Sequence, residues 1–271
     1  MHRHARPLAG LLAAAAVLFS AGCAQIPEGA GSDPQDPWET FNRNSFAFNE
    51  KFDSIVLRPI AKGYEWAVPQ VMRDSIGNVF VNLGEPANIL NNGLQGKGEG
   101  ALASLFRLMI NTTLGVGGLF DVAGTAGNQP ERSEDFGQTL AVWGVGSGPY
   151  FVIPFVGPST VRDSAGLVVG YFSEPMTYAD NDWVEWGLWG LKVVDVRARM
   201  LPATDLLKGA VDPYLMAREA YLANRINEIY DGNPPLELME DAFPEDPMED
   251  EEEGGAAAIE APAAEAGGAS L

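Results

Sequence analysis

The sequence lacks almost all of the side chains that carry covalent catalysis or bind transition metals. Its only two histidines are His2 and His4, and its single cysteine is Cys23. Without imidazole or thiol in the rest of the chain, Ser-His-Asp and Cys-His nucleophilic sites and the usual zinc sites are excluded. A glycine-rich phosphate loop and an EF-hand loop are missing as well. We therefore expect no catalytic residue, no metal, no cofactor and no enzymatic activity.

Basic residues are also scarce. The chain of 271 residues has 17 Lys and Arg against 37 Asp and Glu, a net charge of −20. This balance argues against nucleic-acid binding. Residues 236–271 carry twelve of the acids and no base, and residues 249–253 are all acidic. This composition predicts a disordered, self-repelling acidic tail, for which solubilisation is the simplest role.

No apolar run is long enough to span a bilayer. Residues 8–19 form an apolar stretch of about 12 residues, whereas a spanning helix needs about 20. The stretch follows Arg3 and Arg6 and ends in small residues before Cys23. This order is typical of a signal peptide (residues 1–22) that ends at a lipid-acceptor cysteine, which would carry acyl chains such as palmitate. Ala24, in place of Asp, favours sorting to the outer membrane. The alternative is an ordinary signal peptide with a chance cysteine.

The rest of the chain is punctuated as a series of helices. Residues 23–35 are rich in Gly, Pro and Asp and predict a linker, and residues 36–235 predict one all-α domain. We expect helices near 36–55, 59–68, 69–83, 99–114, 159–172, 182–201 and 212–231. Asp36, Ser159 and Asp212 are the predicted N-caps, with Glu39 completing a capping box for Asp36. The Glu85-Pro86 pair predicts a break.

Aromatic residues recur at helical spacing in two places. Trp38, Phe41, Phe48 and Phe52 predict a core stripe, with a face toward a ligand, partner or lipid as the alternative. The second set lies in residues 183–189 and suits a protein core and a membrane–water interface equally; its members are Trp183, Trp186 and Trp189.

Residues 140–158 break the usual rules for loops, because they are apolar and yet rich in Gly and Pro. Irregular backbone of this kind at membrane depth is tolerated where it is buried in protein or lines a wet cavity. We expect a flexible hairpin beside a cavity, and the alternative is a short β-hairpin buried in a soluble core. The candidate gating residues are Gly144, Gly146, Gly148 and Pro149, because glycine restricts the backbone little.

Several motifs together resemble the VacJ/MlaA family of outer-membrane lipoproteins. They are DPWETFNR (36–43), FRLMINTTLGVGGLFDVA (106–123), FGQTL (136–140), GVGSGPY (144–150) and DPYLMAREAY (212–221). They lie in the order expected for the family, and the resemblance covers residues 33–232. The acidic tail lies outside it.

The resemblance implies a ring- or doughnut-like helical domain in the inner leaflet of the outer membrane of a Gram-negative bacterium, around an amphipathic channel. It also implies association with a trimeric porin. Such proteins remove mislocalised glycerophospholipids from the outer leaflet and pass them to a soluble periplasmic carrier protein, which maintains lipid asymmetry. The candidate channel-lining residues are Leu105, Arg107, Met109 and Asn111.

Two alternatives to lipid passage stay open. A porin-associated structural lipoprotein without lipid passage would need the same anchor and the same apolar surface. A lipid-hydrolysing enzyme is disfavoured, because the sequence offers no nucleophile–base pair.

Overall fold

The computed structural model describes residues 26–27, 29–127 and 132–238. The signal peptide, Cys23 and the acidic tail beyond residue 238 lie outside the described residues. Contacts divide the chain into two units, Met1–Pro234 and Pro235–Leu271. Only residues 235–238 of the second unit are described, so the fold presented below is that of the first unit.

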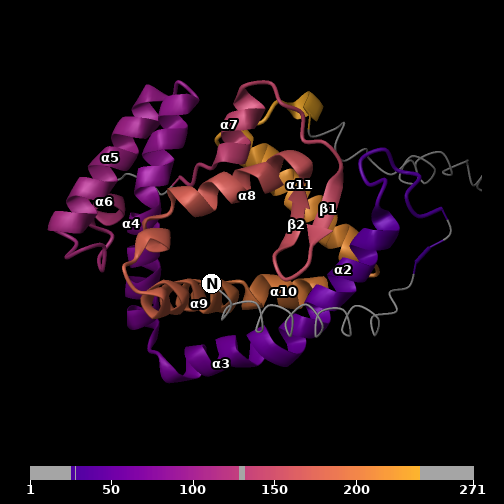
Figure 1. Cartoon of the computed structure of the whole chain (residues 1–271), viewed down its shortest axis with the longest axis horizontal. Helices are drawn as coiled ribbons and strands as arrows, with labels where there is room; N and C mark the ends of the chain where they lie inside the picture. Colours follow the sequence, from indigo (N-terminus) through magenta and orange to yellow (C-terminus); the bar gives the residue numbers. More distant parts are fainter. Residues whose placement is uncertain (1–25, 28, 128–131, 239–271) are drawn as a thin grey trace, which may run out of the picture. The chain divides into compact units, whose positions relative to one another are not determined.

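The first unit is mostly helical, which confirms the predicted all-α class (Figure 1). One short antiparallel hairpin interrupts the helices, with Tyr150 opposite Thr160 and Ile153 opposite Gly157. In chain order the elements are α2 (Glu39–Phe52), the π-helix η1 (Asp53–Leu57), α3 (Arg58–Ala67), α4 (Gln70–Leu94), α5 (Gly98–Thr113), α6 (Val122–Thr125), α7 (Phe136–Val142), β1 (Tyr150–Ile153), β2 (Gly157–Thr160), α8 (Val161–Ser173), the 3-10 helix η2 (Pro175–Tyr178), α9 (Asp182–Arg199), α10 (Leu201–Leu207) and α11 (Pro213–Ile229).

The contacts between these elements form a closed series. The helix α2 packs on β1, β2 packs on α8, α8 contacts α4, and α4 contacts α9; α9 then packs on α3, which returns through η1 to α2. Figure 1 shows this series encircling a gap, with α5 and α6 on the side of α4 that faces away from it. The first unit is therefore a ring of helices closed by one β-hairpin. Among the described helices, none combines the length and the apolar character needed to cross a bilayer.

The predicted N-caps meet different outcomes. Asp212 caps α11 as predicted, accepting hydrogen bonds from the backbone N–H groups of Tyr214 and Leu215. Thr160, the last residue of β2, caps α8 in place of Ser159, because α8 begins at Val161 and the Thr160 hydroxyl accepts the N–H of Asp163 (3.2 Å). The prediction for Asp36 is wrong: α2 begins at Glu39, and no side chain caps it.

Asp36 instead anchors the start of the domain to its C-terminal helix. It is fully buried and accepts hydrogen bonds from Asn42 Nδ2 (2.6 Å) and the Tyr214 hydroxyl. Arg218 of α11 lies 3.4 Å from Asp36 and 2.9 Å from Asp33. A buried carboxylate needs such partners, and the charge of Arg218 competes with the cap geometry that the local sequence favours.

Two segments that the sequence predicts to be non-helical are helical in the structure. Pro86 lies inside α4, which continues for 25 residues from Gln70 to Leu94. Buried polar residues on both sides of Pro86 bind neighbouring elements: Glu85 pairs with Arg107, and Asn88 Oδ1 accepts the N–H of Glu134 (2.9 Å). These tertiary contacts outweigh the helix-breaking tendency of proline. Residues 140–142 likewise end α7 and are helical.

Candidate functional site

The interior of the ring domain is polar and its surface is apolar. Within the described residues, 22 buried side chains are polar or charged and 11 are hydrophobic. Large apolar side chains are exposed on most elements, among them Trp66 (90% exposed), Trp183 (87%) and Trp186 (70%). This is the reverse of the arrangement in a water-soluble protein, where apolar surface is removed from water. It suits a molecule whose surroundings are themselves apolar.

The aromatic stripe of α2 largely follows the same inversion, so the prediction that it forms the core holds for Phe48 but not for Trp38 and Phe41. Phe48 is buried, but Trp38 and Phe41 are each 47% exposed. The buried side chains of α2 are mostly polar: Glu39, Asn42, Arg43, Ser45 and Phe48. The spacing of the aromatic residues predicts the helix, but which face of the helix is buried depends on whether the surroundings are water or lipid.

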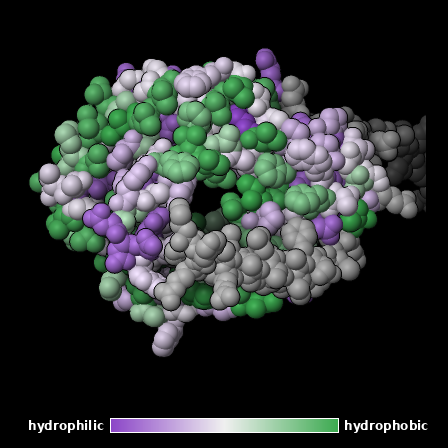
Figure 2. Space-filling view, in the orientation of Figure 1, coloured by the Kyte–Doolittle hydropathy of each residue, from purple (hydrophilic) through white to green (hydrophobic). Residues whose placement is uncertain are grey.

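Figure 2 shows a hollow where Figure 1 shows the ring, and hydrophobic residues gather around part of its rim. The helix α8, which borders the gap in Figure 1, buries only one strip, formed by Arg162, Asp163 and Gly166. The remainder of its circumference is largely apolar and exposed, including Val168 and Phe172 at 61% each. A helix in such a ring offers apolar side chains both to the hollow and to the outside.

The β-hairpin lies between this hollow and α2 in Figure 1 and is held by two asparagines. Asn42 donates to the carbonyl of Tyr150 (3.2 Å) and accepts the N–H of Val152 (2.9 Å). Seven residues along the same face of α2, Asn49 donates to the carbonyl of Ile153 (3.0 Å) and accepts the N–H of Phe155 (2.7 Å). The two amides therefore pair with the free edge of β1 as a neighbouring strand would.

The loop between α7 and the hairpin carries the predicted gating residues. Gly144 (φ +87°) and Gly148 (φ +66°) occupy the left-handed region that favours glycine, whereas Gly146 does not. A Cβ atom at Gly144 or Gly146 would meet nothing within 4 Å. The end of the loop is fixed, because the carbonyl of Pro149 accepts the N–H of Val161 at the start of α8 (3.3 Å). The free space lies at residues 144–146, before the hairpin.

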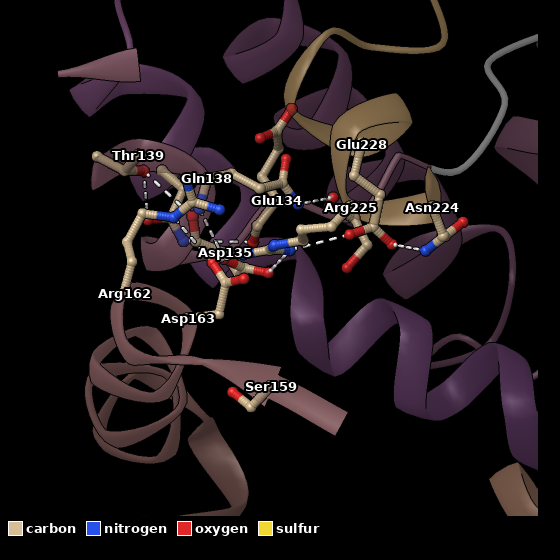
Figure 3. A network of polar contacts seen from close by, with 12 residues as sticks. Glu134, Asp135, Gln138, Thr139, Ser159, Arg162, Asp163, Asn224, Arg225 and Glu228 are labelled. Carbon is tan, nitrogen blue, oxygen red and sulfur yellow. Dashed lines mark hydrogen bonds and ion pairs between the residues drawn. The ribbon is translucent and has the colours of Figure 1, made fainter. Parts of the chain in front are cut away.

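Arg225 joins the elements behind the hairpin (Figure 3). It forms a bidentate pair with Asp135 at the start of α7 (2.6 and 2.7 Å) and contacts Asp163 of α8 (3.0 Å). Asp163 also accepts hydrogen bonds from Thr160 of β2 (2.8 Å) and the Tyr221 hydroxyl (2.9 Å). Bidentate Arg–carboxylate pairs fix both distance and orientation. This Arg225 network therefore fixes α7, α8, α11 and the hairpin relative to one another.

The electrostatics of the Arg225 network keep its carboxylates ionised. Burial by itself raises the pKa of Asp163, but the hydrogen bond from Arg162 and the charge of Arg225 outweigh burial and hold this pKa below 3.8. The same contest between burial and Arg225 lowers the pKa of Asp135. Burial lowers the pKa of Arg225, and the two aspartates more than reverse this, so the guanidinium stays charged.

Two glycines allow α7 and α8 to approach closely enough for Arg225 to contact both Asp135 and Asp163. A Cβ atom on Gly166 of α8 would lie 2.5 Å from the backbone nitrogen of Gly137 of α7. A Cβ atom on Gly137 would lie 2.5 Å from Arg225 Nη2 and 2.7 Å from Asp163 Oδ1. Any side chain at either position would separate α7 from α8 or displace the ion pair.

The structure places the predicted channel-lining residues on α5. Arg107 is 2% exposed and donates to Glu85 (2.6 Å), with Asp121 3.4 Å away. Asn111 is buried too, donating to Asp121 (2.8 Å) and accepting the N–H of Ala123 (2.9 Å). Arg107 also borders a cavity of about 1000 Å³ beside α5. These contacts bind α4, α5 and α6 together, and channel lining by Arg107 and Asn111 remains a prediction from the sequence.

Leu105 and Met109 are exposed on α5, at 39% and 52%. Because α5 lies on the side of α4 that faces away from the gap in Figure 1, its exposed face is placed for the surroundings of the ring rather than for the hollow. Channel lining by Leu105 and Met109 remains a prediction from the sequence. Among the described residues, no group of three or more His, Cys, Asp or Glu side chains could hold a metal ion.

Comparison with known proteins agrees with this architecture. Residues 34–228 match the model of the MlaA lipoprotein family. The chain is 40% identical over 210 residues to the "intermembrane phospholipid transport system lipoprotein MlaA" of Escherichia coli K12, covering 74% of this chain and 80% of that protein. It is 34% identical over 221 residues to the protein of the same name from Haemophilus influenzae, covering 79% and 86%.

A solved structure described as "Structural basis for maintenance of bacterial outer membrane lipid asymmetry" is similar with a TM-score of 0.64 at 36% identity. The similarity covers 73% of this chain and 99% of that chain. The fold and the site define a helical ring protein with a polar interior, an apolar surface and an open centre. The chain belongs to the MlaA lipoprotein family.

Reasoning from the sequence missed the residues that build this site. It assigned no role to Asn42, Asn49 or Arg225. Polar residues on one side of a helix, as in the DPWETFNRN segment, are typical of a solvent-exposed face, so the local pattern carried no signal for Asn42. The partners of Arg225 lie 62 and 90 residues away, so no local pattern identifies them.

Proposed function

We propose that this protein removes mislocalised glycerophospholipids from the outer leaflet of the outer membrane and passes them toward a soluble periplasmic carrier protein, maintaining lipid asymmetry. The observation that carries the proposal is the hollow inside a ring whose buried side chains are polar and whose open surfaces are apolar. Membership of the MlaA lipoprotein family, whose curated relatives are named for intermembrane phospholipid transport, supports it.

The geometry suits the physical problem of lipid movement. A phospholipid crosses a bilayer slowly because its charged head resists hydrocarbon, and placing a charged side chain at the bilayer centre costs about 3 kcal/mol or more. A passage with polar groups for the head and apolar contacts for the tails lowers this barrier. Removal of the lipid by the periplasmic carrier protein would give the transport its direction. The proposal therefore includes no covalent step, cofactor or nucleotide.

The same proposal places the protein in the membrane. Acyl chains on Cys23 would hold it in the periplasmic leaflet, since several chains anchor a protein durably. The apolar surface, with Trp66, Trp183 and Trp186 exposed, would contact lipid tails and a trimeric porin, because tryptophan favours membrane–water interfaces. A ring held in one leaflet beside a porin could receive lipids from the other leaflet.

The loop at residues 144–149 is the proposed hinge for the hairpin. Gly144→Ala requires a Cβ-bearing residue at φ +87°, which costs about 1–2 kcal/mol, whereas Gly146→Ala carries no such strain. Both side chains would enter open space. We expect more outer-leaflet phospholipid with G144A than with G146A, measured by accessibility of phospholipid to an external lipase in cells. If both variants match the wild type, the hinge role is wrong.

Deletion of the whole gene tests the function itself. We expect the phospholipid of the outer leaflet to rise, and expression of the intact protein to restore it. An unchanged outer leaflet after a clean deletion would overturn the proposal. Normal lipid clearance by a folded, porin-bound variant with bulky residues at both Gly144 and Gly146 would instead favour the structural alternative, a porin-associated lipoprotein without lipid passage.

A further inference from the structure

The tip of the β-hairpin contains a residue in an unfavourable backbone conformation. Phe155 has φ +68°, in the left-handed region that residues with a Cβ atom rarely adopt. Of the two neighbouring turn residues that also follow β1, Pro154 cannot donate a hydrogen bond and Val156 donates to the carbonyl of Ile153 (3.2 Å). The turn alone does not account for the conformation of Phe155, so contacts outside the turn must stabilise it.

Two kinds of contact from α2 supply that stabilisation. The ring of Phe155 packs edge-on against Phe48 and Phe52, with ring centroids 4.9 and 5.1 Å apart. Asn49 holds the backbone on both sides of Pro154 through the carbonyl of Ile153 and the N–H of Phe155. Both contacts come from one face of one helix, so they form and break together.

The tip differs from the base of the hairpin in burial. At the base, Asn42, Tyr150 and Val152 are almost completely buried. At the tip, Phe155 is 44% exposed and Asn49 is only half-buried. Exposed hydrogen bonds and few packed neighbours characterise the segments of a protein that open most readily. Release from α2 therefore begins at the tip, while Asn42 keeps the base in place.

We propose that Asn49 and Phe155 form a releasable latch that holds the hairpin tip against α2 and out of the hollow. In Figure 1 the hairpin lies between α2 and the gap, so a tip that leaves α2 has the hollow on its other side. Release removes the strain at Phe155 and costs the aromatic and amide contacts, and these opposing terms let both positions be populated. The latched state leaves the passage open. This inference rests on the proposed function and assigns the residues that position its gate.

Hydrogen exchange of the full-length lipoprotein in detergent micelles tests the latch directly, with single-residue resolution at the amides of Val152 and Phe155. Asn49→Ala should speed exchange at Phe155 about two- to tenfold, the range that corresponds to one net hydrogen bond. Phe155→Ala should speed exchange at Val156 and Gly157 by a similar factor, because both aromatic contacts are lost. Exchange at Val152, which Asn42 holds, should stay slow in both variants.

Two matched controls separate the latch from a general effect of mutation. Asn44→Ala removes an asparagine from the same helix whose amide donates only within α2, to the carbonyl of Thr40 (2.8 Å). Val156→Ala truncates an exposed residue of the same turn. Both controls should exchange as the wild type does. Phe155→Tyr keeps the aromatic ring and should restore slow exchange.

Outer-leaflet phospholipid in cells completes the test. We expect N49A and F155A to raise it, and N44A, V156A and F155Y to leave it unchanged. Unaltered exchange at the tip in N49A and F155A would overturn the latch, and faster exchange with normal lipid clearance would overturn its role in holding the passage open. Failure of the proposed function is recognised separately, because the gene deletion would then also leave the outer leaflet unchanged.

Discussion

The two sides of the ring are held together by different physics. On one side, α7, α8, α11 and the hairpin meet at the Arg225 network, where Asp163 and Arg225 are buried and their separation is fixed by several hydrogen bonds. On the other side, α3, α9 and α10 meet at a small apolar cluster of Ala61, Ala198 and Leu201. Ion pairs on this second side have more exposed partners, with side chains 16% and 52% exposed in Arg58–Asp205 and 11% and 25% in Arg197–Asp53, against 9% and 5% in Arg225–Asp163. A half-buried hydrogen bond from the Tyr64 hydroxyl to Asp195 (2.9 Å) adds to the contact between α3 and α9.

The difference indicates which side can move. Ionic hydrogen bonds have defined directions, so α8 and α11 cannot slide past each other without breaking them. Small side chains such as Ala61 and Ala198 let helix backbones approach closely without fixing a register, as in membrane helix pairs. We therefore expect the α3–α9–α10 side to deform first, with the Arg225 side acting as the frame of the ring.

The largest effect should come from breaking that frame. Arg225→Ala leaves Asp163 with Arg162 as its remaining cationic partner and removes the bidentate partner of Asp135. Losing one partner of a buried ion pair costs about 3–5 kcal/mol. We expect a large fall in the thermal midpoint in detergent micelles. Arg225→Lys should recover only part of it, because lysine lacks the bidentate fork. Arg132→Ala, at an exposed position, is the control. Equal melting of R225A and R132A would contradict the assigned frame.

The apolar side should tolerate change better. Ala198→Leu adds methyl groups where Ala198 is 1% exposed and packs on α3, and such overpacking costs about 1–3 kcal/mol. We expect a moderate fall in the same thermal midpoint and faster proteolysis between α3 and α4. Ala203→Leu, at an exposed position of α10, should do neither. A198L that melts as low as R225A would remove the contrast between the two sides.

Acid should weaken the frame by a smaller amount. The pKa values of Asp135 and Asp163 are lowered in the folded protein, so their contribution to stability is complete above the ordinary value of 3.8 and is lost as pH falls below it. The thermal midpoint should therefore drop between about pH 4 and pH 2. Asp163→Asn should have a lower midpoint at neutral pH and a shallower drop. A slope as steep in D163N as in the wild type would assign the acid sensitivity to other groups.

The smallest effect is expected at the surface of the second side. Arg58→Gln breaks the pair with Asp205, whose side chain is 52% exposed, and exposed ion pairs contribute little to stability. The thermal midpoint should change little, and added salt should change the wild type equally little. A loss comparable to that of A198L would mean that this ion pair, and not the apolar cluster, holds α10 against the start of α3.

The helices could largely be predicted from the sequence, because their periodicity and proline positions are local. Asp212-Pro213 marks the start of α11 correctly, whereas Asp36-Pro37, with the same local pattern, does not cap α2. The difference is that Asp36 pairs with Tyr214 and Arg218, which lie almost two hundred residues away along the chain.

Burial could not be predicted in the same way. The rule that aromatic stripes turn inward assumes water outside, and it fails for Trp38 and Phe41. The hydrogen-bonding roles of Asn42 and Asn49 depend on a strand more than a hundred residues away along the chain. Glycines at 137 and 166 carry no local signal of the close approach between α7 and α8. Local sequence patterns therefore predict most of the helices, but they do not predict which residues come together at the site.

The attachment of Asp33 and Asp36 to Arg218 fixes where the tether of the domain begins. Asp33 lies ten positions after the predicted acyl site at Cys23. A fully stretched chain advances at most about 3.3–3.6 Å per residue, so this segment reaches at most roughly 35 Å. A molecule acylated at Cys23, as proposed, would therefore reach partners only within about one membrane thickness of its anchor. A longer segment before Pro27 would increase this distance and leave the contacts of Gly31 with Glu39 and of Asp33 with Arg218 unchanged.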